Sequence, residues 1–555
     1  MARMAEGENG SATPFPFLQF TFVQSLIGSS PSELRSSPEF GSGCQSDGSK
    51  KHVQTVSIVG FGGFGKTTLA KAQYDRVEAQ FDCVAFVSVS WTPDITRIFN
   101  KMLYELDEEK YAGINEAVRD LEQLITELRR FLQYKRYLIV IDDIWDEKLW
   151  EIKCAVPENN SSCRIITTSR KLSVSEASCS SIDDHIYRMK PLSDDESQKL
   201  FYKRIFHQGE GCPPELEQVS KDILKKCGGV PLAIISVASL LATHHNHNIK
   251  AKDQWHIVLN SIGHGLTDGG NVEDMKRILS FSYYDLPSHL KACLVYLSIF
   301  LEDYEIRRGR LIWRWIAEGL IQHKKDEEIF FELGDTYFQD LINRSIIQPV
   351  GINDEGKALA CRVHDMVLDL IRSISRQENF VTMWDGTGQS KSLLGCKVRR
   401  LSLQSTTTAP CPATSLLQVR SFTLLNAATA IDSMPSLSQF KVLRVLDLEG
   451  CDFNKCGGHS KLRHVGNLSQ LRYLGLRRTY IRELPVETGK LQFLQTLDVR
   501  GAHGLQELPP TISGLRNLMC LHIDRHTRLP FGLSNLTSHH ELTGLRVGYD
   551  SLPTL

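Results

Sequence analysis

The sequence predicts a multidomain protein that contains a parallel α/β domain and ends in a solenoid of short repeats. Two observations carry this prediction. A glycine-rich loop joins a short apolar strand to a helix start near residue 60, and a leucine motif recurs seven times in the C-terminal third. Apolar runs of strand length alternate with helical segments over residues 53–190, which indicates a parallel sheet with helices on both faces. A chain of 555 residues is long enough for several domains.

The glycine-rich loop matches G-x-x-x-x-G-K-[ST], follows the apolar run Val56–Val59 and precedes the helix start Leu69–Ala72. Its glycines allow backbone N–H groups to surround phosphates, and the helix N-terminus adds partial positive charge. We expect Lys66 to reach the β- and γ-phosphates of ATP and Thr67 to bind Mg²⁺. A ligand-free turn would not explain the Lys-Thr pair. The nucleotide-binding residues predicted here are Gly60, Gly62, Gly63, Gly65, Lys66, Thr67 and Thr68.

A second part of the site is predicted about 75 residues downstream. The apolar run Tyr137–Ile141 ends in Asp142 and Asp143. It is typical of a buried parallel strand, and ligands of open α/β sheets bind at the carboxyl ends of the strands. Asp142 is the candidate for Mg²⁺ coordination, directly or through water. Asp143 is the candidate catalytic residue, which would orient the attacking water.

Further motifs follow in a set order. They are Phe81–Ser90, Asp143–Asp146, Arg164–Arg170, Gly228–Ala233, Phe300–Ile306 and Val363–Asp365. Over about residues 53–380 this series resembles the NB-ARC module of plant immune receptors of the nucleotide-binding, leucine-rich-repeat class. Trp145 makes the motif Asp143–Asp146 resemble those of the coiled-coil-type branch of that class.

The resemblance implies roles for three more residues. Arg170 resembles the sensor that reads the γ-phosphate end, and Pro231 the proline that packs on adenine. His364 resembles the histidine that touches the ADP β-phosphate and locks the closed state. The resemblance also implies an α/β P-loop NTPase domain, a helical bundle, a winged-helix domain and a leucine-rich-repeat solenoid. The predicted boundaries are 1–52 (disordered), 53–190 (nucleotide binding), 191–270 (helical), 271–385 (winged helix) and 386–555 (repeats).

The repeats follow the pattern L-x-x-L-x-L. Their central positions, which we expect in strands along a concave face, step by 21, 24, 28, 23, 24 and 24 residues. No capping repeat is visible near Leu555, so we expect the chain to end within the repeats. The motifs are Val398–Leu403, Val419–Leu424, Leu443–Leu448, Leu471–Leu476, Leu494–Val499, Leu518–Ile523 and Leu542–Val547.

Charge is unevenly distributed. Residues 386–555 carry 20 Lys and Arg against 11 Asp and Glu, a net charge of +9, although the whole chain has a net charge of −1. These basic residues are interspersed with leucines and not clustered with aromatic side chains. We therefore expect docking against the acidic remainder of the chain, and no nucleic-acid binding.

Composition favours a cytoplasmic protein. The fourteen cysteines are scattered without a CxxC pair, which is typical of free thiols in a reducing compartment. No apolar run reaches the roughly 18 residues that span a bilayer. The segment 14–27 lacks the flanks of a signal peptide.

The N-terminal segment departs from the family. Residues 1–52 are rich in Gly, Ser and Pro and show no heptads, so disorder is predicted. Receptors of the coiled-coil branch begin with a long helical domain, which we expect this chain to lack. On that ground the chain expressed alone is expected to cause no hypersensitive cell death.

The predicted function is an ADP/ATP-controlled switch of plant defence, with ADP in the off state and ATP in the on state. The repeats would provide autoinhibition and recognition of an effector, a guarded host protein or a partner receptor, and the ATP state could self-associate. Two alternatives stay open, a productive ATPase and a truncated, non-signalling decoy. Many fast P-loop ATPases carry Glu where this chain has the shorter Asp143, so at most slow hydrolysis is expected.

Overall fold

The computed structural model divides into two compact units, Met1–Ser282 and Tyr283–Leu555, which are described separately. The division falls within one helix, α11 (Val272–Tyr284), and not at a predicted domain boundary. The predicted N-terminal disorder lies outside the described residues. The structure describes residues 53–89, 95–111, 120–146, 152, 155–157, 163–179, 181–206, 212–245, 251–262, 266, 272–321, 329–384, 398–403, 413–425, 434–453, 462–502, 504–531 and 541–543.

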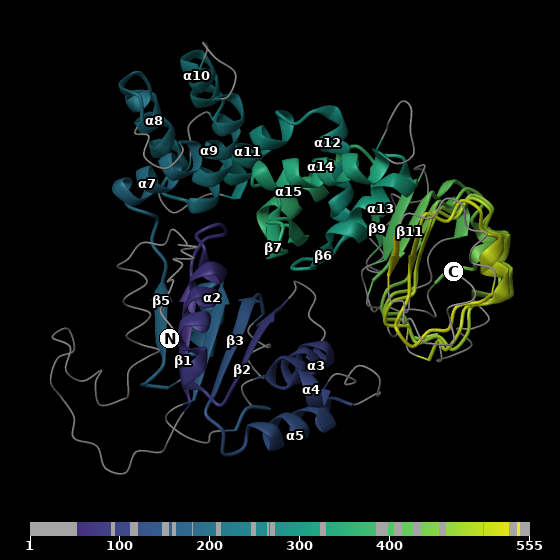
Figure 1. The fold of residues 1–555 in the computed structure, drawn as a ribbon. Coiled ribbons are helices and arrows are strands. Elements are labelled where there is room, and N and C mark those ends of the chain that lie inside the picture. Colours follow the sequence, from purple (N-terminus) through teal and green to yellow (C-terminus); the bar gives the residue numbers. More distant parts are fainter. Residues whose placement is uncertain are drawn as a thin grey trace, which may run out of the picture. The chain divides into compact units, whose positions relative to one another are not determined.

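A five-stranded parallel sheet forms the centre of the first unit, in the order β2-β3-β4-β1-β5 (Figure 1). Every residue of β1, β3 and β4 is buried, as expected for strands covered on both faces. The predicted parallel α/β domain is therefore present. Its strands are β1 (Gln54–Val59), β2 (Cys83–Ser88), β3 (Tyr137–Ile144), β4 (Arg164–Ser169) and β5 (His185–Arg188). Its helices are α2 (Lys66–Val77), η2 (Glu78–Gln80), α3 (Ile95–Leu106), α4 (Glu108–Tyr111), α5 (Leu121–Leu132) and α6 (Leu172–Ser178).

Four helices after the sheet form the predicted helical bundle. Helix α7 begins with a capping box, in which Ser193 and Glu196 satisfy each other's backbone N–H groups. Phe201 packs edge-on against the buried Trp255 with ring centroids 5.7 Å apart. The helices are α7 (Asp194–Ile205), α8 (Pro214–Cys227), α9 (Pro231–His245) and α10 (Ala251–Ser261).

The second unit begins with the predicted winged-helix domain. Its short antiparallel sheet has the order β6-β8-β7. Trp313 and Trp315 are 2% and 0% exposed, so they are core residues. The elements are α12 (Ser288–Tyr296), η4 (Leu297–Ile299), β6 (Ile306–Arg307), α13 (Arg308–Glu318), α14 (Ile329–Asn343), β7 (Gln348–Ile352), β8 (Ala358–Arg362) and α15 (Asp365–Gln377).

The repeats form an eight-stranded parallel sheet in chain order, β9 to β16. Six of the seven predicted motifs contain one strand each. The seventh was predicted in the wrong register, because β16 begins at Glu541 and Leu542 stands opposite Leu521, where Leu545 was expected. Strand β9 (Thr382–Trp384) is an eighth that the motif search missed, and it pairs with β10 just before the predicted boundary at residue 386. The other strands are β10 (Arg400–Leu403), β11 (Ser421–Leu424), β12 (Val445–Asp447), β13 (Tyr473–Gly475), β14 (Thr496–Asp498), β15 (Cys520–His522) and β16 (Glu541–Thr543).

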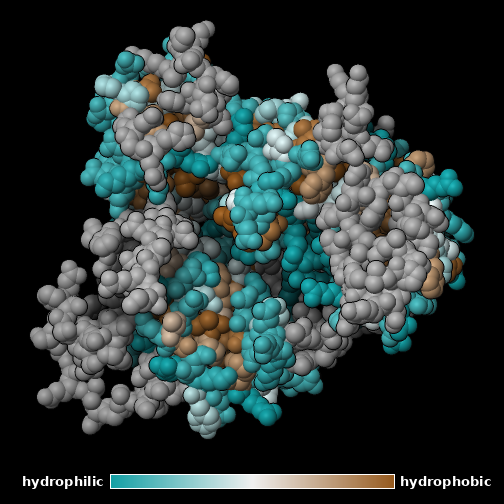
Figure 2. Space-filling model, viewed as in Figure 1, coloured by the Kyte–Doolittle hydropathy of each residue, from teal (hydrophilic) through white to brown (hydrophobic). Residues whose placement is uncertain are grey.

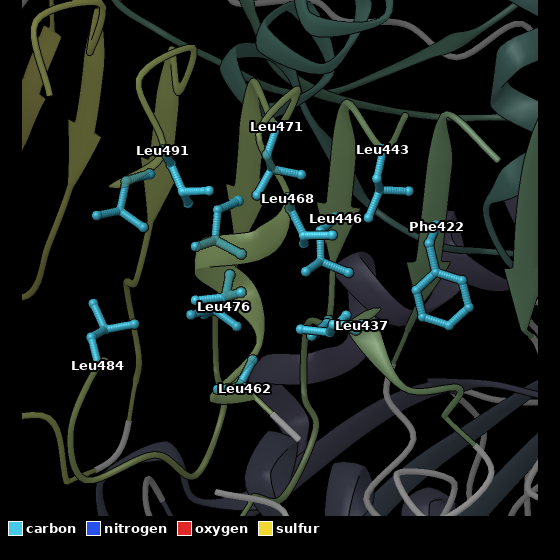
Figure 3. Packing of buried hydrophobic residues seen from close by; sticks show 14 of the residues in the cluster. Phe422, Leu437, Leu443, Leu446, Leu462, Leu468, Leu471, Leu476, Leu484 and Leu491 are labelled. Carbon is cyan, nitrogen blue, oxygen red and sulfur yellow. The ribbon is translucent and has the colours of Figure 1, made fainter. Parts of the chain in front are cut away.

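Short 3₁₀ turns return the chain between strands and close the solenoid core. Leucines from strands and turns point into one continuous interior, as Leu446, Leu471 and Leu484 show in Figure 3. A single repeat could not bury these side chains alone, which is why the repeats stack. The turns are η6 (Ala413–Gln418), η8 (Leu437–Gln439), η9 (Val465–Asn467), η10 (Val486–Lys490) and η11 (Pro510–Gly514).

Three further properties of the described residues agree with the composition. On the face in Figure 2, hydrophilic residues dominate the described surface and hydrophobic ones form small patches. Within the described part of the chain, no helix has the length and apolar content to cross a bilayer. The nine cysteines described by the structure are all free, as predicted.

Candidate functional site

The glycine-rich loop connects β1 to the N-terminus of α2, which starts at Lys66. Gly63 and Gly65 have φ angles of 86° and 89°, in the left-handed region that favours glycine. A Cβ atom on Gly63 would lie 2.9 Å from the Cβ of Leu232, so a side chain at this position has no room. The loop therefore has the backbone freedom and the close packing that a phosphate cradle requires.

Lys66 and Thr67 are the first two residues of α2, which begins three residues earlier than the predicted helix start at Leu69. Lys66 is 7% exposed, and its Nζ donates to the carbonyl oxygen of Phe61 in the same loop at 3.2 Å. The Thr67 hydroxyl donates to Asp142 Oδ1 at 3.1 Å. The start of α2 and the carboxyl end of β3 are thus joined by a hydrogen bond between the two residues expected to bind Mg²⁺.

Asp142 lies at the carboxyl end of β3 and is 1% exposed. A second donor to the same Oδ1 atom comes from the adjacent strand β4, where the Thr168 hydroxyl lies at 2.6 Å. Thr168 Oγ1 also accepts the backbone N–H of Asp143 at 2.8 Å. Thr168 thus fixes both aspartates, although the sequence analysis did not select it. The sequence feature that could have identified Thr168 is the polar carboxyl end of the otherwise apolar strand β4.

Asp143 adopts a left-handed backbone conformation with φ of 58°, where the register between β3 and β4 shifts. Such a conformation costs a non-glycine residue roughly 1–2 kcal/mol and is tolerated best by Asn and Asp. Its side chain accepts the Trp145 indole N–H at 2.9 Å and lies 3.6 Å from Arg170 Nε. The Arg170 guanidinium in turn stacks over the Trp145 ring at 4.5 Å. These three residues form one cluster at the carboxyl end of the sheet.

Helix α9 contacts the glycine-rich loop directly. Pro231 is its first residue, and the next amide, that of Leu232, donates to the carbonyl oxygen of Gly63 at 3.2 Å. A proline at the first helical position loses no intrahelical hydrogen bond. Pro231 is therefore held beside the glycine-rich loop, and its expected packing on adenine stays a prediction.

His364 lies in the second unit, at the N-cap of α15. Its Nδ1 accepts the backbone N–H of Met366 at 3.2 Å, so this nitrogen caps the helix. Asp365 is the first residue of that helix, where a carboxylate interacts favourably with the helix dipole.

The donor set at the loop fits Mg²⁺ together with a nucleotide. Mg²⁺ prefers oxygen ligands and binds most often through one or two protein groups plus phosphate oxygens and waters. Thr67 and Asp142 provide such a pair within hydrogen-bond distance of each other. Among the described residues no group of three or more His, Cys, Asp or Glu side chains is arranged to hold a metal by itself.

Buried charges join the winged-helix domain to the repeats within the second unit. Arg310 and Arg314 of α13 are 3% and 0% exposed, and a nitrogen of each lies 2.5 Å from Asp447 Oδ2 of β12. Arg310 also pairs with Glu449, and Arg314 donates to Thr423 Oγ1 at 2.7 Å. Since alternate strand residues face opposite sides, Asp447 faces away from the leucine core. Helix α13 therefore covers this part of the concave face.

Electrostatics keep these buried groups ionised. Burial by itself would raise the pKa of Glu449, but the charges of Arg310 and Arg477 outweigh it, so that pKa lies below its ordinary value. The pKa of Arg310 rises well above its usual range, because Asp447 and Glu449 outweigh the opposing effect of burial. The contact is thus a network of paired charges.

Comparisons with known proteins cover most of the chain. Residues 46–211 match the family model of the NB-ARC domain, 299–371 that of the disease resistance protein winged helix domain, and 418–554 that of a leucine-rich repeat region.

Individual relatives come from rice and Arabidopsis. Disease resistance protein RGA5 of Oryza sativa subsp. japonica is 36% identical over 527 residues, which is 92% of this chain and 45% of that protein. Disease resistance protein Pik-2 of the same subspecies is 34% identical over 84% of this chain and 50% of that protein. The putative disease resistance RPP13-like protein 3 of Arabidopsis thaliana is 32% identical over 82% of this chain and 53% of that protein. The chain thus spans about half the length of the curated relatives it matches, and by its three family domains in this order it belongs to the plant NB-ARC leucine-rich-repeat receptor family.

Proposed function

We propose that the chain is an ADP/ATP-binding switch that acts in plant defence in the cytoplasm. The observation that carries this proposal is the meeting of Thr67, Asp142 and Thr168 at the carboxyl end of the sheet, directly beside the glycine-rich loop. The family supports the biological setting, because the relatives named above are disease resistance proteins.

The loop residues would bind the phosphates. Lys66 donates to a loop carbonyl in this structure, and its ammonium group can turn to phosphate oxygens by rotation of its flexible stem. Backbone N–H groups of the loop and the N-terminus of α2 add further donors. Mg²⁺ would neutralise phosphate charge when bound, with Thr67 and Asp142 as its protein ligands. Pro231 would pack on the adenine.

Hydrolysis is proposed to be slow. Asp143 is the candidate that orients water, but its carboxylate is engaged by Trp145 and Arg170. It would have to leave those partners to act on a water molecule. Arg170 is the candidate sensor of the γ-phosphate. When ATP binds, Arg170 would leave Asp143 and contact the phosphate instead, and the Asp143 carboxylate would then lose one of its two partners.

The closed state is proposed to retain ADP through His364. Nδ1 of His364 caps α15, and in the ADP state the other ring nitrogen, Nε2, would contact the phosphate. Asp365 adjoins it and would hold the ring orientation. A ligand shifts such an equilibrium only through its different affinity for the two states. We propose that the repeats add autoinhibition and protein recognition, and that the ATP state can self-associate.

The test is to purify the chain and identify its bound nucleotide by mass, for the wild type and Lys66→Arg. Arginine keeps the charge but replaces the compact ammonium that fits among phosphates. We expect co-purified ADP in the wild type and a loss of retention of about tenfold, or about 1.4 kcal/mol, in the variant. Unchanged ADP retention in Lys66→Arg would contradict the proposed nucleotide site.

A further inference from the structure

A row of arginines runs along one edge of the repeat sheet. The residue that follows the first apolar position of each L-x-x-L-x-L motif is arginine in four consecutive repeats. The backbone N–H of Arg420 donates to the carbonyl oxygen of Arg399 at 2.7 Å, and the amides of the next two members continue this ladder at 2.7 and 2.8 Å. These residues, here called the arginine row, are Arg399, Arg420, Arg444 and Arg472.

The spacing of the row follows from the sheet. Adjacent strands lie about 4.8 Å apart, so the four side chains start from backbone positions that span about 14 Å. Arg399 and Arg420 are exposed, and Arg444 and Arg472 are half-buried. The row ends where the next two repeats place Gln495 and Met519 in the same register.

The members of the row lack ionic partners. Within the described part of the chain, none of their guanidinium groups takes part in an ion pair or a side-chain hydrogen bond. The acidic residue that influences Arg420 is Glu318, and this carboxylate is already held by Arg400 at 2.9 Å. Burial, and then the charges of Arg444 and Arg399, lower the pKa of Arg420. The row therefore concentrates like charges.

Three buried or partly buried arginines elsewhere in the second unit are neutralised. Arg314 pairs with Asp447, and Arg500 pairs with Asp498 at 2.6 Å. Arg477 lies 3.5 Å from Glu449. The fold thus supplies carboxylates to its buried arginines and none to the row. Four like charges in register cost stability unless an anion from elsewhere meets them.

We propose that the arginine row is a docking site for an acidic helix of a partner protein. Carboxylates at positions i and i+4 of a helix lie about 5–6 Å apart, close to the spacing of the row. Guanidinium and carboxylate groups form bidentate hydrogen bonds, so each turn of such a helix can pair with one arginine. Single-stranded nucleic acid fits less well, because its binding relies on aromatic stacking platforms and Tyr473, beside Arg472, is buried. This site is independent of the nucleotide site.

The test uses the full chain and a fluorescent helical peptide of about four turns with Glu on one face at i,i+4 spacing. A peptide with Gln at the same positions is the probe control. The variant Arg420→Gln/Arg444→Gln/Arg472→Gln removes three charges from the row. The variant Arg463→Gln/Arg482→Gln/Arg516→Gln removes three exposed charges elsewhere in the repeats and is its matched control.

Fluorescence anisotropy should show that the row variant binds the Glu peptide at least about tenfold more weakly than the wild type, while the matched control changes by less than about threefold. The Gln peptide should not bind. Thermal unfolding should show that the row variant is at least as stable as the wild type, because three like charges are removed. If the row variant and the matched control lost affinity for the Glu peptide equally, binding would reflect general charge attraction, and the proposal would be overturned. The proposal would also be overturned if the wild type bound a single-stranded oligonucleotide more tightly than the Glu peptide and the row variant lost that binding.

Discussion

Arg314 of the winged-helix domain and Asp447 of the third predicted repeat form a buried ion pair, with Nη1 and Oδ2 2.5 Å apart. Their side chains are 0% and 1% exposed, although the two residues are 133 positions apart in the sequence. The Arg314 guanidinium also stacks 5.0 Å from the Phe300 ring centroid, and its Nε donates to the Tyr296 hydroxyl. The winged-helix domain and the first repeats are thus connected through a buried polar contact.

Removing one partner of this pair should be strongly destabilising. Asp447→Asn leaves Arg310 and Arg314 buried without their shared carboxylate, and loss of one partner of a buried pair costs about 3–5 kcal/mol. Denaturant unfolding, followed by a spectroscopic signal from the second unit, should show that the free energy of unfolding falls by this amount. The exposed pair Arg136–Asp82 is the matched control, and Asp82→Asn should leave the free energy of unfolding nearly unchanged because solvent screens this pair. Similar costs for the two variants would contradict the structural role given to Asp447.

Acid should weaken the second unit. The pKa values of Glu449 and Asp498 are lowered, because their arginine partners outweigh the opposing effect of burial. Groups with a lowered pKa contribute stability above their unfolded values of about 4.3 and 3.9, and that stability is lost as the pH falls through the folded values. Melting temperatures measured from pH 7 downward should therefore fall steeply below about pH 4. Glu449→Gln should be less stable at pH 7 and show a shallower fall.

Thr168 should matter for Mg²⁺-dependent nucleotide retention. Its hydroxyl orients Asp142 and accepts the Asp143 amide, so Thr168→Val would release both aspartates. We expect ADP retention in Mg²⁺ to weaken by about tenfold, with a smaller change in EDTA. Thr167→Val is the control, because the Thr167 hydroxyl donates to Ser57 and not to the site. An equal effect of the two substitutions would show that only strand stability is involved.

Local motifs were predictable from the sequence, and contacts between distant segments were not. The glycine-rich loop, the two aspartates and six of the seven predicted repeat strands each follow from residues close together in the chain, whereas the register of β16 was predicted wrongly. Thr168 acquires its role only because β3 and β4 are adjacent, which no local pattern records. Strand β9 was missed because Thr382–Trp384 lacks the leucine pattern of the repeats.

The buried arginines were missed for a different reason. Arginine in a helix is ordinarily a solvated residue, and Arg310 and Arg314 become core residues only through carboxylates that lie more than a hundred positions away. The burial of the neighbouring Trp313 and Trp315 follows from the type of side chain alone. No local pattern indicates that α13 covers the repeats.

Turnover should separate a switch from a productive ATPase. If the Asp143 carboxylate remains engaged by Trp145 and Arg170, steady-state hydrolysis should be well below the roughly 10 s⁻¹ median of enzymes. Phosphate release by the purified chain at saturating ATP and Mg²⁺ measures this directly. Trp145→Phe removes the indole donor but keeps the ring under Arg170, so a modest rise in rate is expected. A wild-type rate at or above the median would favour the productive ATPase.

The final prediction concerns the closed state. Asp365→Val should weaken ADP relative to ATP and raise the fraction of purified protein that carries ATP, as measured by mass. The substitution also removes a carboxylate from the first turn of α15, which by itself costs helix stability of about 0.3–1 kcal/mol. Glu378, at the opposite end of α15, provides a control for a general loss of charge on this helix. Glu378→Val should leave the ADP:ATP ratio unchanged, because it is far along the helix from His364. If Asp365→Val and the wild type carry the same ADP:ATP ratio, then neither Asp365 nor its neighbour His364 contributes to the lock, and the closed state must be held by other contacts.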